Sequence, residues 1–213
     1  MRNLIEKYQP KPIGEKRRYA VFIPLIWENN DWHLLYEIRS QQISQPGEVS
    51  FPGGRVEVGE TYQEAAVRET MEELAISSDA IDLWGEIDYS VQSQRTIHCF
   101  VGQLMIDDWR LLKSNDEVEC FFTVPLSQLR KQKPVYYDLH SQPIKTPSFP
   151  FDRIRNGIKY PFKNQQYAIP FYEQFDHLIW GMTAQFTKCL TDILNDESIA
   201  KKNPLDIEKS KGR

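Results

Sequence analysis

Four glutamates gather in a short stretch after residue 59 and could bind a cation. They are Glu60, Glu69, Glu72 and Glu73, and the last three fall within five residues. Such a density of negative charge destabilises a folded chain unless a cation offsets it. Carboxylate oxygens are the ligands that hard divalent cations prefer, and Mg²⁺ usually binds one or two carboxylates together with substrate phosphates. The spacing therefore indicates metal-assisted chemistry on a phosphate.

A helix over residues 62–74 should carry most of these acids. Thr61 and Glu64 have the spacing of a capping box, which makes Thr61 the expected N-cap. The following residues contain neither Gly nor Pro and include several good helix formers. We expect one side of this helix to pack on a sheet. That side comprises Val67, Thr70, Met71 and Leu74.

The other side of the helix should present Glu69, Glu72 and Glu73 together, because residues three and four apart are neighbours on a helix. Arg68 lies four residues before Glu72 and can offset part of the repulsion. Two alanines, residues 65–66, are expected beside the acids, where small side chains leave room for a metal and a ligand. Taken by itself, the helix favours the more common alternative, a solvated, Glu-rich surface helix.

Two glycines come shortly before the helix, in the segment Phe51-Pro52-Gly53-Gly54. Because glycine lets the backbone approach a ligand closely, a carbonyl or amide of Gly53 or Gly54 could join a metal or phosphate site. An ordinary strand-to-helix turn is the alternative. Six residues of specified type stand at fixed spacings here, and the probability of a chance match is on the order of 10⁻⁵. They are Gly54, Glu60, Arg68, Glu69, Glu72 and Glu73.

This six-residue pattern resembles the Nudix box. Nudix hydrolases cleave a nucleoside diphosphate linked to a variable group, so the resemblance implies a hydrolase with a nucleotide substrate. It also implies an α/β fold in which a mixed β-sheet is sandwiched between α-helices. Two positions depart from the usual pattern. Thr70 stands where an aliphatic residue is usual, and Ala75 stands where Gly is usual.

Neither departure removes an acid. Thr70 falls on the packing side, so it bears on the fit against the sheet. Ala75 stands where the helix should end, and a left-handed backbone at a residue other than Gly costs about 1–2 kcal/mol. We therefore expect the helix to end by another geometry.

The chain is also similar to the coenzyme A pyrophosphatase branch of that family. The resemblance spans about residues 19–190, although a basic residue expected between Ser40 and Gly47 is absent. It implies splitting of coenzyme A or acyl-coenzyme A into 3′,5′-ADP and (acyl-)4′-phosphopantetheine. One alternative is hydrolysis of ADP-ribose, dinucleotides or nucleoside triphosphates; another is a catalytically silent nucleotide-sensing module. The segments that carry the resemblance are residues 35–40, 45–54, 115–118, 124–126 and 179–184.

The resemblance also implies roles for individual residues. Glu69 and Glu73 are the expected ligands of Mg²⁺ or Mn²⁺, with Glu72 as a third ligand and the Gly53 carbonyl as a fourth. Bound metal would act as a Lewis acid and lower the pKa of a water. Arg68 is expected to orient Glu60 or Glu69 with its forked donors. It could instead be only a surface partner of Glu72.

A base for the attacking water is expected on a later strand. Glu117 is the first candidate and Glu119 the alternative, and regular alternation would point both to the same side. Two solvated carboxylates are the competing interpretation. Arg39 and Arg55 are the expected anchors for substrate phosphates.

The length of 213 residues favours a single domain over residues 1–200, followed by a mobile basic tail over residues 201–213. Residues 134–172 form an elaboration rich in proline and aromatic residues. It could be a substrate lid, a dimer surface or a packed hairpin excursion. Other elements are expected as strands at residues 19–27, 32–38, 47–51, 81–89, 96–104 and 117–124, and as a closing helix at residues 177–194.

Composition limits the partners and the compartment. The net charge of −4 does not indicate a nucleic-acid surface. No apolar run approaches about 18 residues, so no membrane span is expected. The N-terminal segment lacks the apolar region of a signal peptide. Three widely spaced cysteines without CxxC are expected as buried, reduced thiols in the cytoplasm. A small nucleotide is the expected partner, and a homodimer is an open alternative.

Overall fold

The computed structural model describes residues 1–8, 10–92 and 94–196, so the tail predicted at residues 201–213 lies outside the described residues. A seven-stranded sheet has the order β3-β2-β1-β6-β5, with β4 paired to β1 and β7 paired to β2. β1 and β6 run parallel, whereas the other pairs are antiparallel. The sheet is therefore mixed, as predicted. Its strands are β1 (Arg17–Glu28), β2 (Asp31–Arg39), β3 (Val49–Ser50), β4 (Gly53–Arg55), β5 (Ile81–Gln92), β6 (Arg95–Leu104) and β7 (Val118–Pro125).

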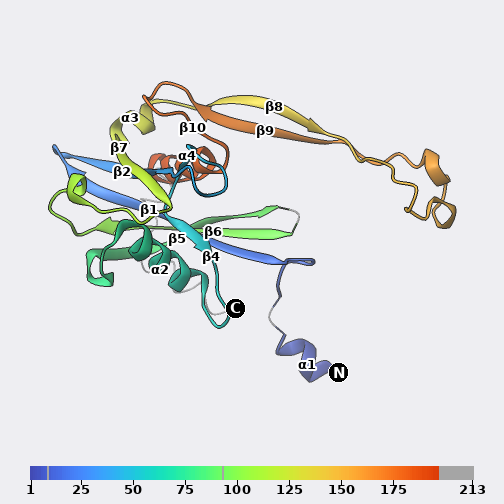
Figure 1. The fold of residues 1–213 in the computed structure, drawn as a ribbon. Coiled ribbons are helices and arrows are strands. Elements are labelled where there is room, and N and C mark those ends of the chain that lie inside the picture. Colours follow the sequence, from blue (N-terminus) through green and yellow to red (C-terminus); the bar gives the residue numbers. More distant parts are fainter. Residues whose placement is uncertain (9, 93, 197–213) are drawn as a thin grey trace.

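Helices cover both faces of this sheet (Figure 1). One face packs on α2 (Tyr62–Leu74), and the other packs on α3 (Leu126–Lys131) and α4 (Gly181–Asn195). Successive side chains of β1 point to opposite faces of the sheet, so Phe22 faces α2 whereas Ile23 faces α4. A short α1 (Arg2–Glu6) precedes the sheet, and the 3₁₀ turns are Ser78–Ala80, Trp109–Leu111, Phe151–Arg153 and Gly157–Lys159.

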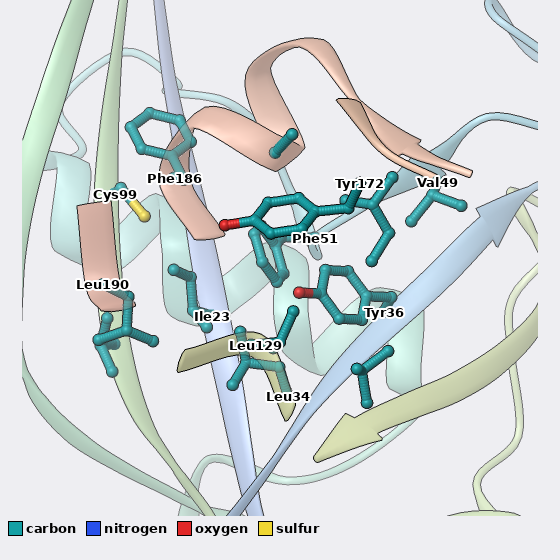
Figure 2. Packing of buried hydrophobic residues seen from close by; sticks show 14 of the residues in the cluster. Ile23, Leu34, Tyr36, Val49, Phe51, Cys99, Leu129, Tyr172, Phe186 and Leu190 are labelled. Carbon is teal, nitrogen blue, oxygen red and sulfur yellow. The ribbon is translucent and has the colours of Figure 1, made fainter. Parts of the chain in front are cut away.

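Aromatic rings fill the layer between the sheet and α4 (Figure 2). Tyr36 stacks on Phe51 with ring centroids 4.8 Å apart, and its hydroxyl lies 3.0 Å from Thr187 Oγ1 on α4. Burying such large rings stabilises the fold strongly. Tyr36 belongs to β2, so this contact fixes the strand that also carries residues on the opposite face toward α2.

The residues predicted as an elaboration form a second sheet with the order β10-β9-β8. Its strands are β8 (Val135–Ser141), β9 (Gln165–Tyr172) and β10 (Ile179–Trp180). β8 and β9 make a hairpin arm that extends away from the body of the molecule (Figure 1). No residue from 141 to 164 is buried. The segment thus forms a hairpin whose outer part is not packed on the core, and the substrate lid and the dimer surface stay predictions.

The closing helix begins later than predicted. Ile179 and Trp180 pair with β9, so the helix starts only at Gly181, whose φ of +63° permits the sharp change of direction. Among the described residues, no helix combines the length and apolar character that crossing a bilayer requires. All three cysteines are free, but only Cys99 is buried; Cys120 on β7 is exposed, contrary to the prediction.

The start of α2 is as predicted. Thr61 Oγ1 accepts a hydrogen bond from the Glu64 amide at 3.2 Å, and Glu64 Oε2 accepts one from the Thr61 amide at 2.8 Å. These two reciprocal bonds satisfy donors that the first helical turn leaves free. Thr70 is fully buried as expected, and its hydroxyl donates to the Ala66 carbonyl at 2.7 Å.

One prediction for α2 is wrong, and it concerns the end of the helix. Ala65 and Ala66 lie one helical turn before Glu69, as expected, and both are fully buried against the β1 face of the sheet, where small side chains allow close helix packing. Ala75 is left-handed, with φ 50° and ψ 46°. The turn is held because the Ile76 amide donates to the Met71 carbonyl at 3.1 Å and Ile76 packs against the core cluster.

Candidate active site

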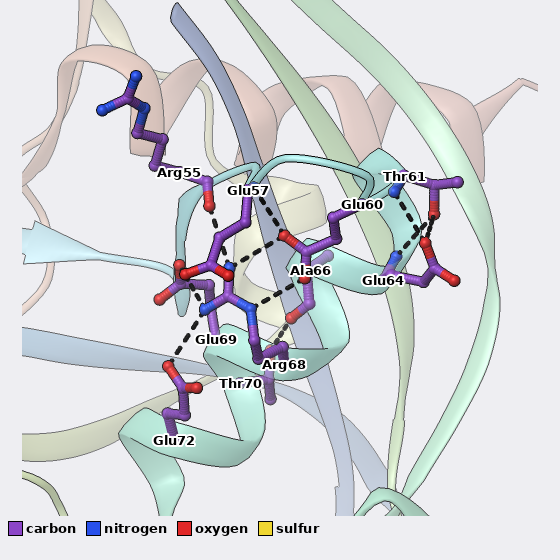
Figure 3. A network of polar contacts seen from close by, with 10 residues as sticks. All are labelled: Arg55, Glu57, Glu60, Thr61, Glu64, Ala66, Arg68, Glu69, Thr70 and Glu72. Carbon is purple, nitrogen blue, oxygen red and sulfur yellow. Dashed lines mark hydrogen bonds and ion pairs between the residues drawn. The ribbon is translucent and has the colours of Figure 1, made fainter.

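Arg68 joins three of the predicted acids in one network (Figure 3). Its Nε donates to Glu60 Oε1 at 2.9 Å, and its Nη1 lies 2.9 Å from Glu69 Oε1 and 3.2 Å from Glu72 Oε2. The remaining nitrogen, Nη2, donates to the Arg55 carbonyl at 3.0 Å. One planar guanidinium therefore links the loop before α2 to two turns of the helix.

The electrostatics of this network favour its charged form. Hydrogen bonding to Arg68 holds the pKa of Glu60 below its ordinary value, and the Glu57 amide, which donates to Glu60 Oε2 at 2.9 Å, adds to that effect. The same bonds to Glu60 raise the pKa of Arg68. The Glu60–Arg68 pair is thus ionised at neutral pH and orients Glu69 by direct contact.

Glu69 lies over Gly54. A Cβ atom at Gly54 would stand 2.3 Å from Glu69 Oε1, so a larger residue there would displace the carboxylate. Burial raises the pKa of Glu69 above its ordinary value, although Arg68 opposes that shift. The requirement for glycine comes here from the close approach of a side chain.

Glu73 is the most buried acid of α2, with 3% of its surface exposed. The Gly53 amide donates to its Oε2 at 2.8 Å. Gly53 is itself confined, because a Cβ there would stand 2.4 Å from the Ala20 carbonyl oxygen and because its φ is +155°. The structure therefore shows the Gly53 amide bound to a carboxylate, whereas the predicted role of its carbonyl stays a prediction.

Glu72 differs from its two neighbours, because 55% of its side chain is exposed. Its only hydrogen bond among the described residues is to Arg68. The helix thus turns Glu69 and Glu73 toward the sheet and leaves Glu72 at the rim of the group.

A buried carboxylate that sequence reasoning missed faces the same region. Glu37 on β2 is 1% exposed, and its Oε1 accepts a hydrogen bond from Ser50 Oγ at 2.8 Å. Its Oε2 is buried without a hydrogen-bond partner among the described residues. Burial, and then the charge of Glu37, raise the pKa of Glu73. The available signal was alternation: Glu37 is two residues from Leu35, whose side chain packs toward α2.

The two candidates for the base are separated by an irregularity in β7. Ile38 pairs with Cys120, whereas Arg39 pairs with Val118, so Glu119 is an extra residue and the expected alternation is broken. Glu119 Oε2 accepts from Gln41 at 3.2 Å. Glu117, just before β7, contributes to the raised pKa of Glu37, Glu69 and Glu73. Glu117 therefore belongs to the acidic group.

The two arginines predicted to bind phosphate occupy different settings. Arg39 donates from Nε to the Ser44 carbonyl at 3.0 Å, and its charge lowers the pKa of Glu37, which places it near the acids. Arg55 is exposed, and its side chain extends away from the Arg68 network (Figure 3). Only the backbone of Arg55 takes part in that network.

The donor set suits a hard divalent cation. It consists of oxygen atoms. Burial raises the pKa of Glu37, Glu69 and Glu73, and the nearby charges of Glu37 and Glu69 raise the pKa of Glu73 further. The unpartnered Glu37 Oε2 is a further sign that a cationic partner fits here. No three His, Cys, Asp or Glu side chains of the described part of the chain are already gathered as a metal cluster. The fit to the ion therefore rests on the oxygen donors and on the unpartnered Glu37 Oε2.

Comparisons with known proteins agree with this geometry. The family profile of the NUDIX domain matches residues 16–142, which is more than half of the chain. Nudix hydrolase 3 of Caenorhabditis elegans is 28% identical over 183 residues, covering 84% of this chain and 73% of that protein. A mitochondrial coenzyme A diphosphatase of Homo sapiens is 26% identical over 180 residues, covering 82% and 68%.

The fold is also found among solved structures. A MutT/nudix family protein from Enterococcus faecalis is similar with a TM-score of 0.51 and 10% identity, covering 91% of this chain and 68% of that chain. At this identity the likeness concerns the fold alone. The domain match, the mixed sheet between helices and the box residues gathered on α2 together show that this chain belongs to the Nudix family of hydrolases.

Proposed function

We propose that this Nudix hydrolase cleaves the pyrophosphate of coenzyme A or acyl-coenzyme A into 3′,5′-ADP and (acyl-)4′-phosphopantetheine. Similarity to a human coenzyme A diphosphatase supports this substrate. The branch-like segments at residues 45–54 and 179–184 support it as well. ADP-ribose, dinucleotides and nucleoside triphosphates are the alternatives that the same machinery could hydrolyse.

The observation that carries the proposed chemistry is the arrangement of α2. Arg68 fixes Glu60 and Glu69, while the Gly53 amide fixes Glu73 in a buried position. Side chains held in this way are already oriented before a substrate arrives, which lowers the cost of reaching a reactive geometry.

Glu69 and Glu73 are the proposed ligands of Mg²⁺ or Mn²⁺, with Glu72 and the Gly53 carbonyl completing the set. Bound there, the cation would supply Lewis-acid polarisation of the pyrophosphate and a more acidic water. Arg68 would keep Glu69 in the position that its contacts define. Glu60 would in turn hold the Arg68 guanidinium in place by accepting its hydrogen bond.

Glu117 is the proposed base. It would accept a proton from the attacking water as the water oxygen bonds to one phosphorus atom. The bridging oxygen would then leave with the other phosphate group. Arg39, near the buried acids, and the exposed Arg55 are the proposed contacts for the phosphates of the substrate.

Replacing Glu73→Gln tests the reaction assignment. We expect hydrolysis to fall by more than about 100-fold, because an amide is a poor substitute for a ligating carboxylate. Circular dichroism should show an unchanged fold. EDTA should abolish hydrolysis by the unmodified protein, and added Mg²⁺ or Mn²⁺ should restore it. Equal turnover by both proteins, or turnover indifferent to chelation, would refute the proposal.

A substrate panel at matched concentration tests the finer claim. Coenzyme A, an acyl-coenzyme A, ADP-ribose, NADH and dNTPs would be incubated with the protein, and the products identified by mass. The proposal requires the highest kcat/KM for a coenzyme A species. Saturable nucleotide binding without any product in the presence of metal would instead favour the sensing module.

The predicted compartment and partners remain part of this proposal. The three free cysteines are compatible with a reducing compartment, for which the cytoplasm is the predicted location. The proposed partner is a small nucleotide, without nucleic acid or membrane. A homodimer is a further possible partner, and its formation would depend on the hairpin arm of β8 and β9.

A further inference from the structure

Burial of the Glu37 carboxylate destabilises the fold unless a partner compensates for its lost hydration. A carboxylate that is 99% removed from solvent loses its hydration, and only one of its two oxygens is compensated, by Ser50 Oγ. Oε2 has no hydrogen-bond partner in the described part of the chain. An uncompensated buried oxygen of this kind is a position where a ligand from outside the chain would be stabilising.

The position of Glu37 near the acids of α2 indicates the kind of ligand that would bind there. Ser50, which binds Glu37, ends β3, and Gly53, which binds Glu73, begins β4 only three residues later. The two carboxylates therefore hold neighbouring parts of one loop. Glu37 lies on the face of β2 toward α2, as the packing of Leu35 shows. Among nearby charges, Glu37 has the largest effect on the pKa of Glu73.

We propose that Glu37 is an additional residue of the divalent-cation site, with Oε2 directed to the ion from β2 opposite the acids of α2. The inference rests on the proposed function, because it takes Glu69 and Glu73 as the ligands from the helix. Ser50 positions Glu37 through the hydrogen bond to Oε1, which leaves Oε2 available to bind the ion. The cation would then have ligands from the sheet as well as from the helix.

Mn²⁺ binding measured by electron paramagnetic resonance tests this without any substrate. Glu37→Gln keeps the size of the side chain and its acceptor for Ser50. We expect it to raise the Kd for Mn²⁺ by about 10- to 100-fold. The metal-free variant should melt at the same temperature as the unmodified protein or higher, because a buried acid has been removed. The rise in melting temperature that Mn²⁺ causes should shrink accordingly.

Glu28→Gln is the matched control. Glu28 is also a strand carboxylate, 20% exposed and paired with Arg110, but it lies at the far end of the β1–β2 hairpin. The Glu28→Gln variant should bind Mn²⁺ with the affinity of the unmodified protein, and this result would exclude a general effect of the lost charge.

Glu73→Gln separates the failure of this inference from the failure of the proposed function. If Glu73→Gln weakens Mn²⁺ binding while Glu37→Gln retains full affinity, Glu37 is only a structural partner of Ser50 and the inference is overturned. If the unmodified protein binds no Mn²⁺, the proposed metal site fails and the role of Glu37 fails with it. Weakened binding in both variants, with Glu28→Gln unaffected, supports both.

Discussion

Arg68 is the residue on which the geometry of the acids most depends. It contacts Glu60, Glu69 and Glu72, and it also binds the Arg55 carbonyl. A surface ion pair alone is worth little, but a fork that holds several partners at once restricts all of them. The structure thus favours an orienting role over a simple pairing with Glu72.

Arg68→Lys should expose that role, because a lysine ammonium cannot reproduce the fork. We expect kcat/KM for pyrophosphate hydrolysis to fall by about 10- to 100-fold, the usual effect of losing a residue that orients a ligand. Thermal unfolding should show only a small loss of stability. Arg110→Lys, at a similar pair with Glu28 and Asp108, is the control that should leave hydrolysis unchanged. Unchanged turnover in Arg68→Lys would reduce Arg68 to a surface partner.

At the scale of elements, what could be predicted was local. The capping box gave the first residue of α2, because its two hydrogen bonds lie within four residues. Features that depend on distant segments were missed. The bulge at Glu119 arises from pairing with β2, and the left-handed Ala75 is held by Ile76 in the core. The bulge has no signature in its own sequence neighbourhood. For Ala75 a local sign existed, because Gly is usual at this position, but the packing of Ile76 that offsets the strain of a non-Gly residue is not visible there.

Ala75→Gly should stabilise the end of α2. Relief of the left-handed strain is worth about 1–2 kcal/mol, and the greater freedom of glycine in the unfolded chain removes about 0.4–1 kcal/mol of it. A net gain of about 0.5–1 kcal/mol corresponds to a rise in Tm of about 1–4 °C for a chain of this size. Differential scanning calorimetry would measure it. Ala66→Gly, the same change within the helix, should instead destabilise by at least about 1 kcal/mol. A lower Tm for Ala75→Gly would contradict the strain argument.

Burial of the acids between α2 and the sheet also predicts how stability varies with pH. Burial and Glu37 raise the pKa of Glu73 above its ordinary value of 4.5. In the metal-free native state Glu73 therefore keeps a proton that the unfolded chain has released. The unfolded state then binds fewer protons, so the free energy of unfolding falls as pH rises from about 4.5 toward the raised native pKa.

Urea unfolding in EDTA between about pH 5 and 8 measures this slope. Glu73→Gln should reduce the slope, because one of the titrating groups is gone, whereas the raised pKa values of Glu37 and Glu69 preserve part of it. Saturating Mg²⁺ should flatten or reverse it, since cation binding favours the deprotonated carboxylates. The pair of Glu60 with Arg68 does not interfere, because a depressed pKa costs stability only as pH falls below about 4.5. Stability that rises with pH in EDTA would show that Glu73 is ionised without metal.

At the scale of the whole molecule, the fold brings together segments that are distant in sequence. Glu37 comes from β2, the glycines from β4, Glu69 and Glu73 from α2, and Glu117 from the entry to β7. The box identifies Gly54 and the acids of α2, and Glu117 was predicted as a base on a later strand. Glu37 was missed, because its place depends on how strands pair, which one sequence does not specify. The hairpin arm lies outside this arrangement altogether (Figure 1).

The arm should join two copies of the chain. In the described structure β8 pairs only with β9, so its outer edge offers free backbone groups. The two strands also expose large apolar side chains, and exposed patches of this kind commonly mark interaction sites. These side chains are Val135, Tyr136, Tyr137, Leu139 and Tyr167. A lid over the acids would have to fold back toward a body from which the arm extends away.

Replacing residues 142–164 by a short glycine turn, together with Tyr137→Ser and Leu139→Ser, tests this assignment. We expect light scattering to show a dimer for the unmodified protein and a monomer for the variant. The Tm of the body should change little, because no residue from 141 to 164 is buried. Shortening the tip alone, with β8 intact, is the control that should remain dimeric. A monomeric unmodified protein whose KM for coenzyme A rises when the arm is cut would instead make the arm a substrate lid.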